Sequence, residues 1–215
     1  MTTEVNRRQQ IEDAASALFR ERGYSATSVR DIAHALNIQG GSLYAHVASK
    51  EDVLWSIVNR AADRFHSLVG PLANNAARPS VRLREMIRAH VAVVTSAQRD
   101  AVVFLHEWRF LSADRRGQIA ARRDAYEALF RAVIAEGIAS SEFAPADPRL
   151  TAMALLSSLN GIASWYRPDG PLSAEDVADR HADLFLRAMS CAPAGESVPP
   201  ADVTEEAHFM MRTIT

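Results

Sequence analysis

Apolar residues recur with a helical period along most of this chain. The first clear stripe, spaced i, i+3, i+4, i+7 and i+8, is formed by Ile11, Ala14, Ala15, Leu18 and Phe19. It predicts a first helix of about four turns, which Gly23 would end as a C-cap residue. No segment shows the alternation of a convincing strand or hairpin. We therefore predict an all-α fold.

Two short helices are expected after the first. Thr27 is a suitable N-cap for a helix over Ser28–Leu36, and the next helix would span Gly40–Val47. Between them, Asn37-Ile38-Gln39 forms a tight link, because asparagine tolerates left-handed backbone. Two short helices joined by about three residues are typical of a helix-turn-helix.

A series of longer helices is predicted for the rest of the chain. Ser49 and Asp52 have capping-box spacing and begin a helix that Gly70-Pro71 should stop near Val69, followed by a loop over 72–79. The apolar pattern predicts further helices over Ser80–Ala97, Asp100–Leu111, Arg115–Gly137, Pro148–Trp165 and Ala174–Met189. An Asp-Pro pair marks the start of the fourth of these helices, and a second capping box marks the start of the fifth.

Composition excludes several classes of protein. Of 215 residues, 48% are hydrophobic and 23% charged, unlike disordered, collagen-like or disulfide-rich chains. The single cysteine, Cys191, excludes an internal disulfide and a multi-thiol zinc site and suits the cytoplasm, and the polar N-terminus is no signal peptide. The longest uncharged stretch, Leu150–Tyr166, is shorter than the roughly 20 apolar residues of a membrane span, so we expect no membrane contact.

Candidate DNA contacts gather at the helix-turn-helix, although a formal net charge of −2 does not itself indicate nucleic acid. In this motif the second helix enters the major groove, and the N-terminus of the first faces phosphate. Thr27 and Ser28 supply hydroxyls there and Arg30 supplies charge, while the ammonium of Lys50 favours an anion at the start of the following helix. The DNA-facing positions of the second helix are Gln39, Gly40, Ser42, Tyr44, Ala45 and His46.

Simpler structural roles remain open for three of these residues. Tyr44 is also suited to packing between helices, and His46 to a solvated position at a helix end. Lys50 is also placed to interact with the helix dipole or with Glu51 alone.

Two segments carry a family resemblance. Gly-Tyr-Ser-Ala-Thr-Ser-Val-Arg-Asp-Ile-Ala over 23–33 and Gly-Ser-Leu-Tyr-Ala-His-Val-Ala-Ser-Lys-Glu over 41–51 resemble the DNA-binding domain of the TetR family of bacterial transcriptional regulators. Three places depart from the family pattern: Asn37 stands where glycine is usual, Val47 replaces an aromatic plug, and Gln39-Gly40 replaces a hydroxyl cap and a base-reading side chain. Because Gly40 and Ala45 bring little side chain, we expect readout from Gln39, Ser42, Tyr44 and DNA shape.

The resemblance implies a domain plan and partners. Residues 1–52 would form the DNA-binding domain, 53–190 a helical ligand-binding and dimerisation domain, and 191–215 a tail. It implies a homodimer on a pseudo-palindromic double-stranded DNA operator, released by a small-molecule effector. Small residues in the predicted helix Pro148–Trp165 and an apolar stripe in Ala174–Met189 suit pairing with a second copy, although both also suit covering the chain's own core.

Candidate effector contacts are polar or aromatic residues within core-like helices and one loop. Beside His90, these candidates are His106, Trp108, Arg109, Arg123, Tyr126, Trp165, Tyr166 and Arg167. The segment Trp-Tyr-Arg-Pro-Asp-Gly-Pro-Leu over 165–172 is similar to actinobacterial TetR-like repressors of fatty-acid, steroid or aromatic-acid degradation, several of which respond to acyl-CoA thioesters. Alternatively, this segment only locks a loop, and Arg109 pairs with Glu107, Asp114 or Asp124.

Signals for catalysis are weak. The chain has no glycine-rich phosphate loop or nucleophile elbow, and His106-Glu107 and His181-x-Asp183 lack the two-histidine helical spacing of a metal site. We expect no catalytic residues, no metal and no cofactor. The interpretations are, in order, a ligand-gated repressor, a DNA-binding regulator without an effector and a helical enzyme. The tail is either an extended link or carries a short helix over Glu205–Ile214.

Overall fold

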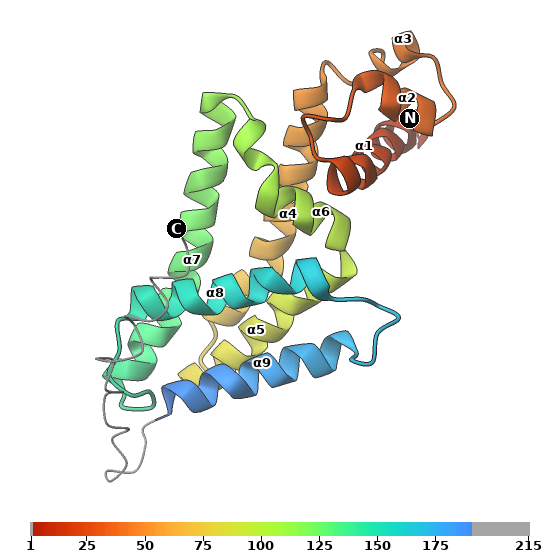
Figure 1. The fold of residues 1–215 in the computed structure, drawn as a ribbon. Coiled ribbons are helices and arrows are strands. Elements are labelled where there is room, and N and C mark those ends of the chain that lie inside the picture. Colours follow the sequence, from red (N-terminus) through yellow and green to blue (C-terminus); the bar gives the residue numbers. More distant parts are fainter. Residues whose placement is uncertain (1, 191–215) are drawn as a thin grey trace, which may run out of the picture.

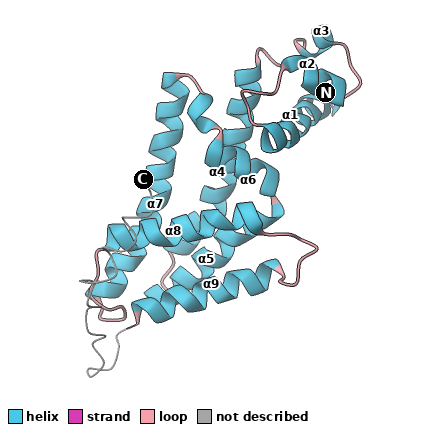
Figure 2. Cartoon of the chain, in the orientation of Figure 1, coloured by secondary structure: helices cyan, strands magenta, loops and turns pink. Residues whose placement is uncertain are grey.

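Helices are the regular elements throughout the described part of the chain (Figure 2). The computed structural model describes residues 2–190, so the predicted tail, including Glu205–Ile214, lies outside the described residues. The elements are α1 (Thr2–Arg22), α2 (Val29–Ala35), α3 (Gly40–Leu43), α4 (Lys50–Ala73), α5 (Pro79–Ser96), α6 (Gln98–His106), the 3-10 helix η1 (Trp108–Phe110), α7 (Ala113–Ala139), α8 (Pro148–Trp165) and α9 (Ala174–Met189). The predicted all-α class is confirmed.

Helices α1–α3 form a small unit at one end of the molecule, and α5–α9 form a larger bundle (Figure 1). Helix α4 packs against α1 on one side and against α5, α6 and α7 on the other. In the bundle, α5 contacts α4, α7, α8 and α9. Because α6 also packs against α1, both α4 and α6 connect the bundle to the small unit.

The small unit has an apolar core of its own. Ile11 and Phe19 of α1, Ile32 of α2 and Leu43 of α3 are all at most 1% exposed. Asn37 has φ of 52°, so the predicted left-handed link between α2 and α3 is confirmed. This core orients α3 relative to α1.

Two predicted helix limits in this unit are wrong. Ser28, not Thr27, is the N-cap of α2, because Ser28 forms a capping box with Asp31. The helix predicted over Gly40–Val47 ends at Leu43, and residues 44–46 form a turn. Two adjacent glycines and the absence of a side-chain cap on Gln39 leave α3 with little intrinsic stability.

Helices of the larger bundle and α4 also depart from the predicted limits. Helix α4 passes through Gly70-Pro71 to Ala73, because burial of Val69 and Ala73 outweighs the hydrogen bond that proline lacks. Helix α6 ends at His106 instead of Leu111, since the chain tightens into η1 and turns to bury Leu111. Helices α5 and α7 differ from prediction by one or two residues at each end, and α8 and α9 match it.

Glycine plays opposite roles at two positions of α7, which yields a stability prediction. A Cβ on Gly137 would lie 2.2 Å from the buried Phe143 ring, whereas a Cβ on Gly117 would meet nothing within 4 Å. We expect Gly137→Ala to lower the free energy of unfolding by about 1–3 kcal/mol through overpacking. Gly117→Ala should raise it by about 0.5–1 kcal/mol through helix propensity. Urea unfolding of both variants tests this, and stabilisation by Gly137→Ala would contradict the close packing.

Candidate DNA-binding surface and effector cavity

Most of the predicted DNA contacts lie on the accessible surface of α2, α3 and the turn that follows. Ser28, Arg30, Gln39 and Ser42 are exposed, and Tyr44 is 57% exposed. Tyr44 therefore does not pack between helices. Gly40 and His46 are partly buried at the same end of the molecule. These positions agree with a groove-facing surface, and base contact by each of them stays a prediction.

Thr27 is the exception among the hydroxyl residues. It is 1% exposed, and its Oγ1 donates to the carbonyl oxygen of Gly23 at 2.9 Å. Its side chain closes the turn between α1 and α2 and is not free to contact phosphate, contrary to the prediction. Ser28 differs, because its hydroxyl remains at the surface while it caps α2 and bonds Asp31. These hydrogen bonds lower the pKa of Asp31.

Lys50 holds the loop between α1 and α2 against the start of α4. Its Nζ donates to the carbonyl oxygens of Tyr24 and Thr27, both at 2.8 Å, and lies 4.1 Å from the centroid of the Tyr24 ring. Partial burial lowers the pKa of Lys50. The Lys50 ammonium therefore stabilises this loop, a role that differs from the predicted phosphate contact and from pairing with Glu51.

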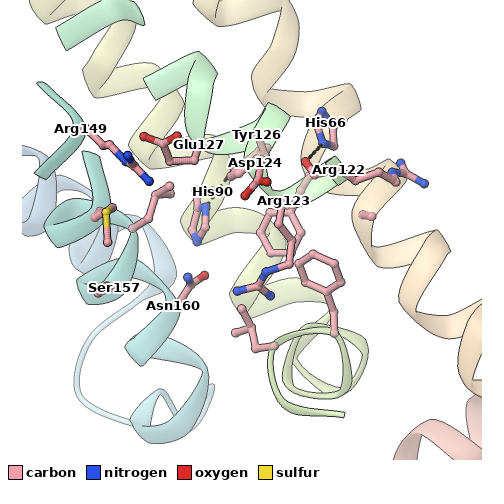
Figure 3. Close-up of a pocket in the computed structure, with 16 residues that line it drawn as sticks. His66, His90, Arg122, Arg123, Asp124, Tyr126, Glu127, Arg149, Ser157 and Asn160 are labelled. Carbon is pink, nitrogen blue, oxygen red and sulfur yellow. Dashed lines mark hydrogen bonds between the residues drawn. The ribbon is translucent and has the colours of Figure 1, made fainter. Parts of the chain in front are cut away.

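A cavity of about 360 Å³, partly open to the surface, lies in the bundle between α4, α5, α6, α7 and α8 (Figure 3). Its aromatic wall centres on Phe65, whose ring lies 5.0–5.6 Å from the rings of His90, Phe104 and Tyr126. The other lining residues include both apolar and charged side chains, namely Ala62, His66, Leu105, Arg122, Arg123, Asp124, Glu127, Arg149, Met153, Leu156, Ser157 and Asn160.

His90 and Tyr126 are buried neutral partners in this cavity. His90 Nδ1 lies 3.0 Å from the Tyr126 hydroxyl. Burial lowers the pKa of His90 to about 3 and raises that of Tyr126, so both side chains are uncharged near pH 7. His90 Nε2 forms no hydrogen bond, but the Asn160 side chain lies nearby and opposes the lowering of the His90 pKa (Figure 3).

Among the described residues, no carboxylate lies at hydrogen-bond distance from the Arg123 guanidinium. Its guanidinium carbon lies 5.4 Å from the Phe104 ring centroid and 5.3 Å from that of Trp108. Burial lowers its pKa, opposed by attraction to Asp124. Nη1 is buried and unpartnered. The neighbouring Arg122 differs, because it bonds Asn59 and Asp63 of α4.

The cavity brings together only part of the predicted effector set. Arg123 and Tyr126 line it. Trp108 does not line it but lies beside the Arg123 guanidinium. His106 and Arg109 are exposed outside it, and Arg109 Nε donates to the His106 carbonyl at 2.8 Å instead of binding a carboxylate.

Three predicted effector contacts lie at the end of α8 and in the loop after it, and they do not line the cavity. They are Trp165, Tyr166 and Arg167. Trp165 stacks on His181, and Arg167 contacts Asp169. Tyr166 is buried elsewhere, and its carbonyl accepts from Gln98 Nε2 at 2.9 Å. These contacts favour the alternative in which this segment locks the loop, and the prediction that it lines the effector site is wrong for this cavity.

Sequence reasoning missed several polar lining residues, namely His66, Arg122, Glu127, Arg149, Ser157 and Asn160. A usable signal existed for Asn160, the one amide within the uncharged stretch Leu150–Tyr166. The charged residues of α7 gave no such signal, because that helix carries charge on most of its surface.

Comparison with known proteins identifies the chain. A model described as "Bacterial regulatory proteins, tetR family" matches residues 11–57, and one described as "Tetracyclin repressor-like, C-terminal domain" matches residues 76–189. The chain belongs to the TetR family. The residues between the two matched ranges lie mostly in α4, and the predicted division between residues 52 and 53 stays a prediction.

Individual relatives are transcriptional regulators. The chain is 30% identical over 183 residues to the transcriptional repressor KstR2 of Mycobacterium tuberculosis, covering 84% of this chain and 92% of the relative. The solved structure of that ketosteroid regulator has a TM-score of 0.82 at 29% identity, covering 86% of this chain and 96% of the other. AibR in complex with isovaleryl coenzyme A and operator DNA has a TM-score of 0.75 at 29% identity, covering 86% and 98%.

Residues 2–190 contain neither a membrane span nor a metal cluster. None of these helices combines the length and apolar character that crossing a bilayer requires. No cluster of three or more metal-ligating side chains occurs in the same part of the chain.

The two hydrogen bonds of Lys50 predict a structural effect. We expect Lys50→Met to lower the free energy of unfolding by about 1–3 kcal/mol in the absence of DNA, because two carbonyl groups lose a charged donor. Arg30→Gln, at an exposed position, should change it by less than about 0.5 kcal/mol. Urea unfolding measures both. Unchanged stability of the Lys50 variant, with a weaker salt dependence of DNA binding, would assign Lys50 to phosphate instead.

Proposed function

We propose that this chain is a ligand-responsive repressor that binds a pseudo-palindromic operator as a homodimer and is released by a small molecule. The observation that carries the proposal is one helix, α4, packed both on the helix-turn-helix unit and on a bundle that contains a cavity. The family relationship supports DNA binding, and the exposed Tyr44 supports contact from the turn after α3. A regulator of chromosomal DNA acts in the cytoplasm, and we infer no enzymatic activity.

A homodimer is supported by apolar residues on the outer surface of the last two helices. Leu150 and Trp165 of α8 and Leu184 of α9 are 50–65% exposed. A second copy pairing through these helices would remove their side chains from water. Twofold symmetry then predicts operator half-sites separated by about one helical turn of DNA or slightly more.

The effector class is inferred from the cavity and from one neighbour. The volume of about 360 Å³ is near the lower end of the range of roughly 300–1,000 Å³ for ligand pockets. AibR was solved with isovaleryl coenzyme A and operator DNA. We infer an acyl-CoA or related hydrophobic acid derivative, of which the acyl part occupies the aromatic cavity.

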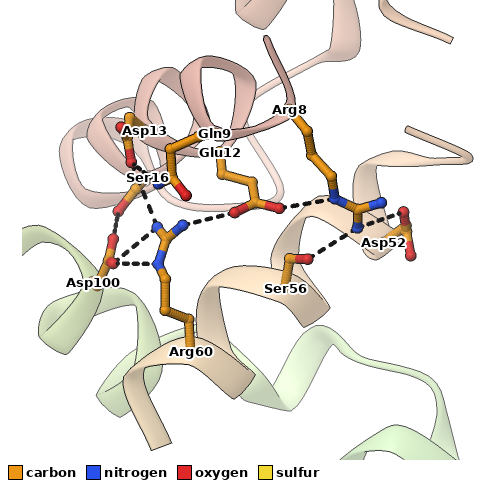
Figure 4. Close-up of polar contacts among 9 residues, drawn as sticks. All are labelled: Arg8, Gln9, Glu12, Asp13, Ser16, Asp52, Ser56, Arg60 and Asp100. Carbon is orange, nitrogen blue, oxygen red and sulfur yellow. Dashed lines mark hydrogen bonds and ion pairs between the residues drawn. The ribbon is translucent and has the colours of Figure 1, made fainter. Parts of the chain in front are cut away.

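An ion-pair network connects the bundle to the DNA-binding unit (Figure 4). Arg60 of α4 contacts Glu12 of α1 at 2.6 Å and Asp100 of α6 at 2.9 Å. Asp100 also accepts a hydrogen bond from Ser16 of α1 at 2.7 Å. Because Phe104 and Leu105 of the same α6 line the cavity, a ligand that displaces α6 acts on α1 through this network.

A second connection runs through η1 and the start of α7. Glu107 accepts from the backbone N–H of Tyr24 at 2.9 Å, and Phe110 stacks on the Tyr24 ring at 5.6 Å. The backbone N–H of Ser112 donates to Glu51 at 3.0 Å, which lowers the pKa of Glu51. Displacement of η1 therefore reaches the loop that Lys50 holds and the start of α4.

Release requires that the effector bind one arrangement of these contacts better than the other. A ligand with equal affinity for the two arrangements shifts nothing. Scaled from population-shift arithmetic, a useful inducer discriminates between the two states by roughly 2–4 kcal/mol.

The function is tested by in vitro selection of genomic fragments at about 0.15 M salt, followed by footprinting. We expect wild-type protein to enrich a pseudo-palindrome, and Tyr44→Ala to lose that enrichment because an exposed groove-facing side chain is removed. Leu68→Ala, exposed on α4 away from this surface, is the matched control and should keep it. No enrichment by wild type, or equal enrichment by the Tyr44 variant, would contradict the proposed binding surface.

Coupling is tested at Asp100. Asp100→Asn keeps the shape of the side chain but removes the charge that Arg60 and Ser16 bind. With an acyl-CoA that releases the wild-type operator complex, we expect the variant to bind the thioester within about threefold of wild type while the coupling free energy falls by about 1–2 kcal/mol.

The control for this experiment is Asp114→Asn, which alters an exposed carboxylate that bonds only its helix neighbour Gln118. Fluorescence anisotropy of labelled operator, measured with increasing thioester, gives the coupling. Full release in the Asp100 variant would show that α6 does not act through this network.

A further inference from the structure

Unsatisfied polar atoms are concentrated in the cavity. Four buried side-chain atoms of the described residues have no hydrogen-bond partner, and three of them belong to cavity-lining residues, namely His90 Nε2, Arg123 Nη1 and Glu127 Oε1. Buried polar groups without a partner are rare and costly, and a group that a ligand can satisfy is one explanation for them. Arg123 Nη1 is a donor, Glu127 Oε1 is an acceptor, and His90 Nε2 is one or the other according to its tautomer.

The hydrogen bond between His90 and Tyr126 indicates whether His90 Nε2 carries a hydrogen. Within the described part of the chain, the Tyr126 hydroxyl has one polar partner at hydrogen-bond distance, His90 Nδ1. If the hydroxyl donates to Nδ1, the neutral ring carries its proton on Nε2. The opposite tautomer would leave both the hydroxyl hydrogen and the Nε2 lone pair unpaired, which costs more. His90 is thus a neutral N–H donor facing the cavity.

Arg123 adds a positive charge to this donor. Figure 3 shows the His90 ring and the Arg123 side chain directed into the same part of the cavity. Aromatic rings flank the guanidinium, and no described carboxylate forms an ion pair with it. Of the two carboxylates that line the cavity, Asp124 attracts Arg123 without forming an ion pair with it, and Glu127 contacts Arg131 at 3.8 Å. A half-buried guanidinium beside an N–H donor is suited to an anion with two acceptor oxygens.

We propose that the effector carries a carboxylate, bound in this cavity between Arg123 and His90. The proposal rests on the proposed function, because it takes the cavity to be the effector site. The apolar remainder of the ligand would contact Phe65, Phe104 and Leu156. Two sources supply this chemistry: a free apolar carboxylic acid, or the terminal carboxylate of a dicarboxylic acid joined to coenzyme A as a thioester.

Matched ligand pairs test the proposal on the full chain by isothermal titration calorimetry. One pair is cyclohexanecarboxylate and the neutral cyclohexanecarboxamide, and the other is glutaryl-CoA and pentanoyl-CoA. We expect the carboxylate of at least one pair to bind at least about tenfold tighter than its neutral partner, since a charge-assisted hydrogen bond is worth about 1.4 kcal/mol or more. The pair that shows the preference identifies the source.

Variants assign the preference to Arg123. Arg123→Gln should weaken the carboxylate at least about tenfold and the neutral partner less than about threefold, and Arg123→Lys should keep part of the preference through its charge. Arg116→Gln, exposed on the same helix and outside the cavity, is the matched control and should leave both affinities unchanged. Thermal unfolding of each variant verifies that it is folded.

The outcomes separate this proposal from the proposed function. Neutral ligands that bind as tightly as the acids, no binding by either acid, or a preference that survives Arg123→Gln would overturn the carboxylate site. If a thioester with an uncharged acyl chain releases operator while the acids show no advantage, the repressor function stands and this proposal fails. If an acid binds through Arg123 without changing operator affinity, the carboxylate site stands, and the proposal that a ligand in this cavity releases operator fails.

Discussion

The two-sided packing of α4 is the constraint on which the rest of the structure depends. Its first turns carry Val53, Leu54 and Ile57, which are buried, and its later turns carry Phe65 and Val69, also buried. Because α1 packs on this helix at one end and α5 and α7 along the rest, neither unit can reorient without disturbing apolar contacts of α4. A cavity beside Phe65 is thereby connected mechanically to the loop that Lys50 closes at the start of the same helix.

In residues 2–190, several arginines at contacts between helices pair with carboxylates, whereas Arg123 in the cavity does not. Where helices must stay in register, arginines are matched: Arg60 with Glu12 and Asp100, and Arg88 with Asp179 between α5 and α9. In the cavity, the guanidinium of Arg123 lacks such a partner. A buried or half-buried charge favours a fixed partner, so the paired arginines act as internal connections and Arg123 is suited to an external ligand.

Sequence patterns predicted the helix-turn-helix and most bundle helices because each of these depends on local periodicity and caps. Helices α8 and α9 match to the residue, since an Asp-Pro pair and a capping box mark their starts. The errors occur where tertiary contacts override local preference. Burial of Ala73 carries α4 through Pro71, and two glycines with no side-chain cap leave α3 at four residues.

The sequence by itself determined the fold class, the order of helices and the family, because these follow from apolar spacing and from motif residues close together in the chain. Only the tertiary structure decided which polar residues face one another. It placed Lys50 on the carbonyls of Tyr24 and Thr27, and it separated Trp165 and Arg167 from the cavity that Arg123 and Tyr126 share. The reason is geometric, since a polar residue on a helix finds its partner across the packing of several helices, and periodicity along one helix does not specify that partner.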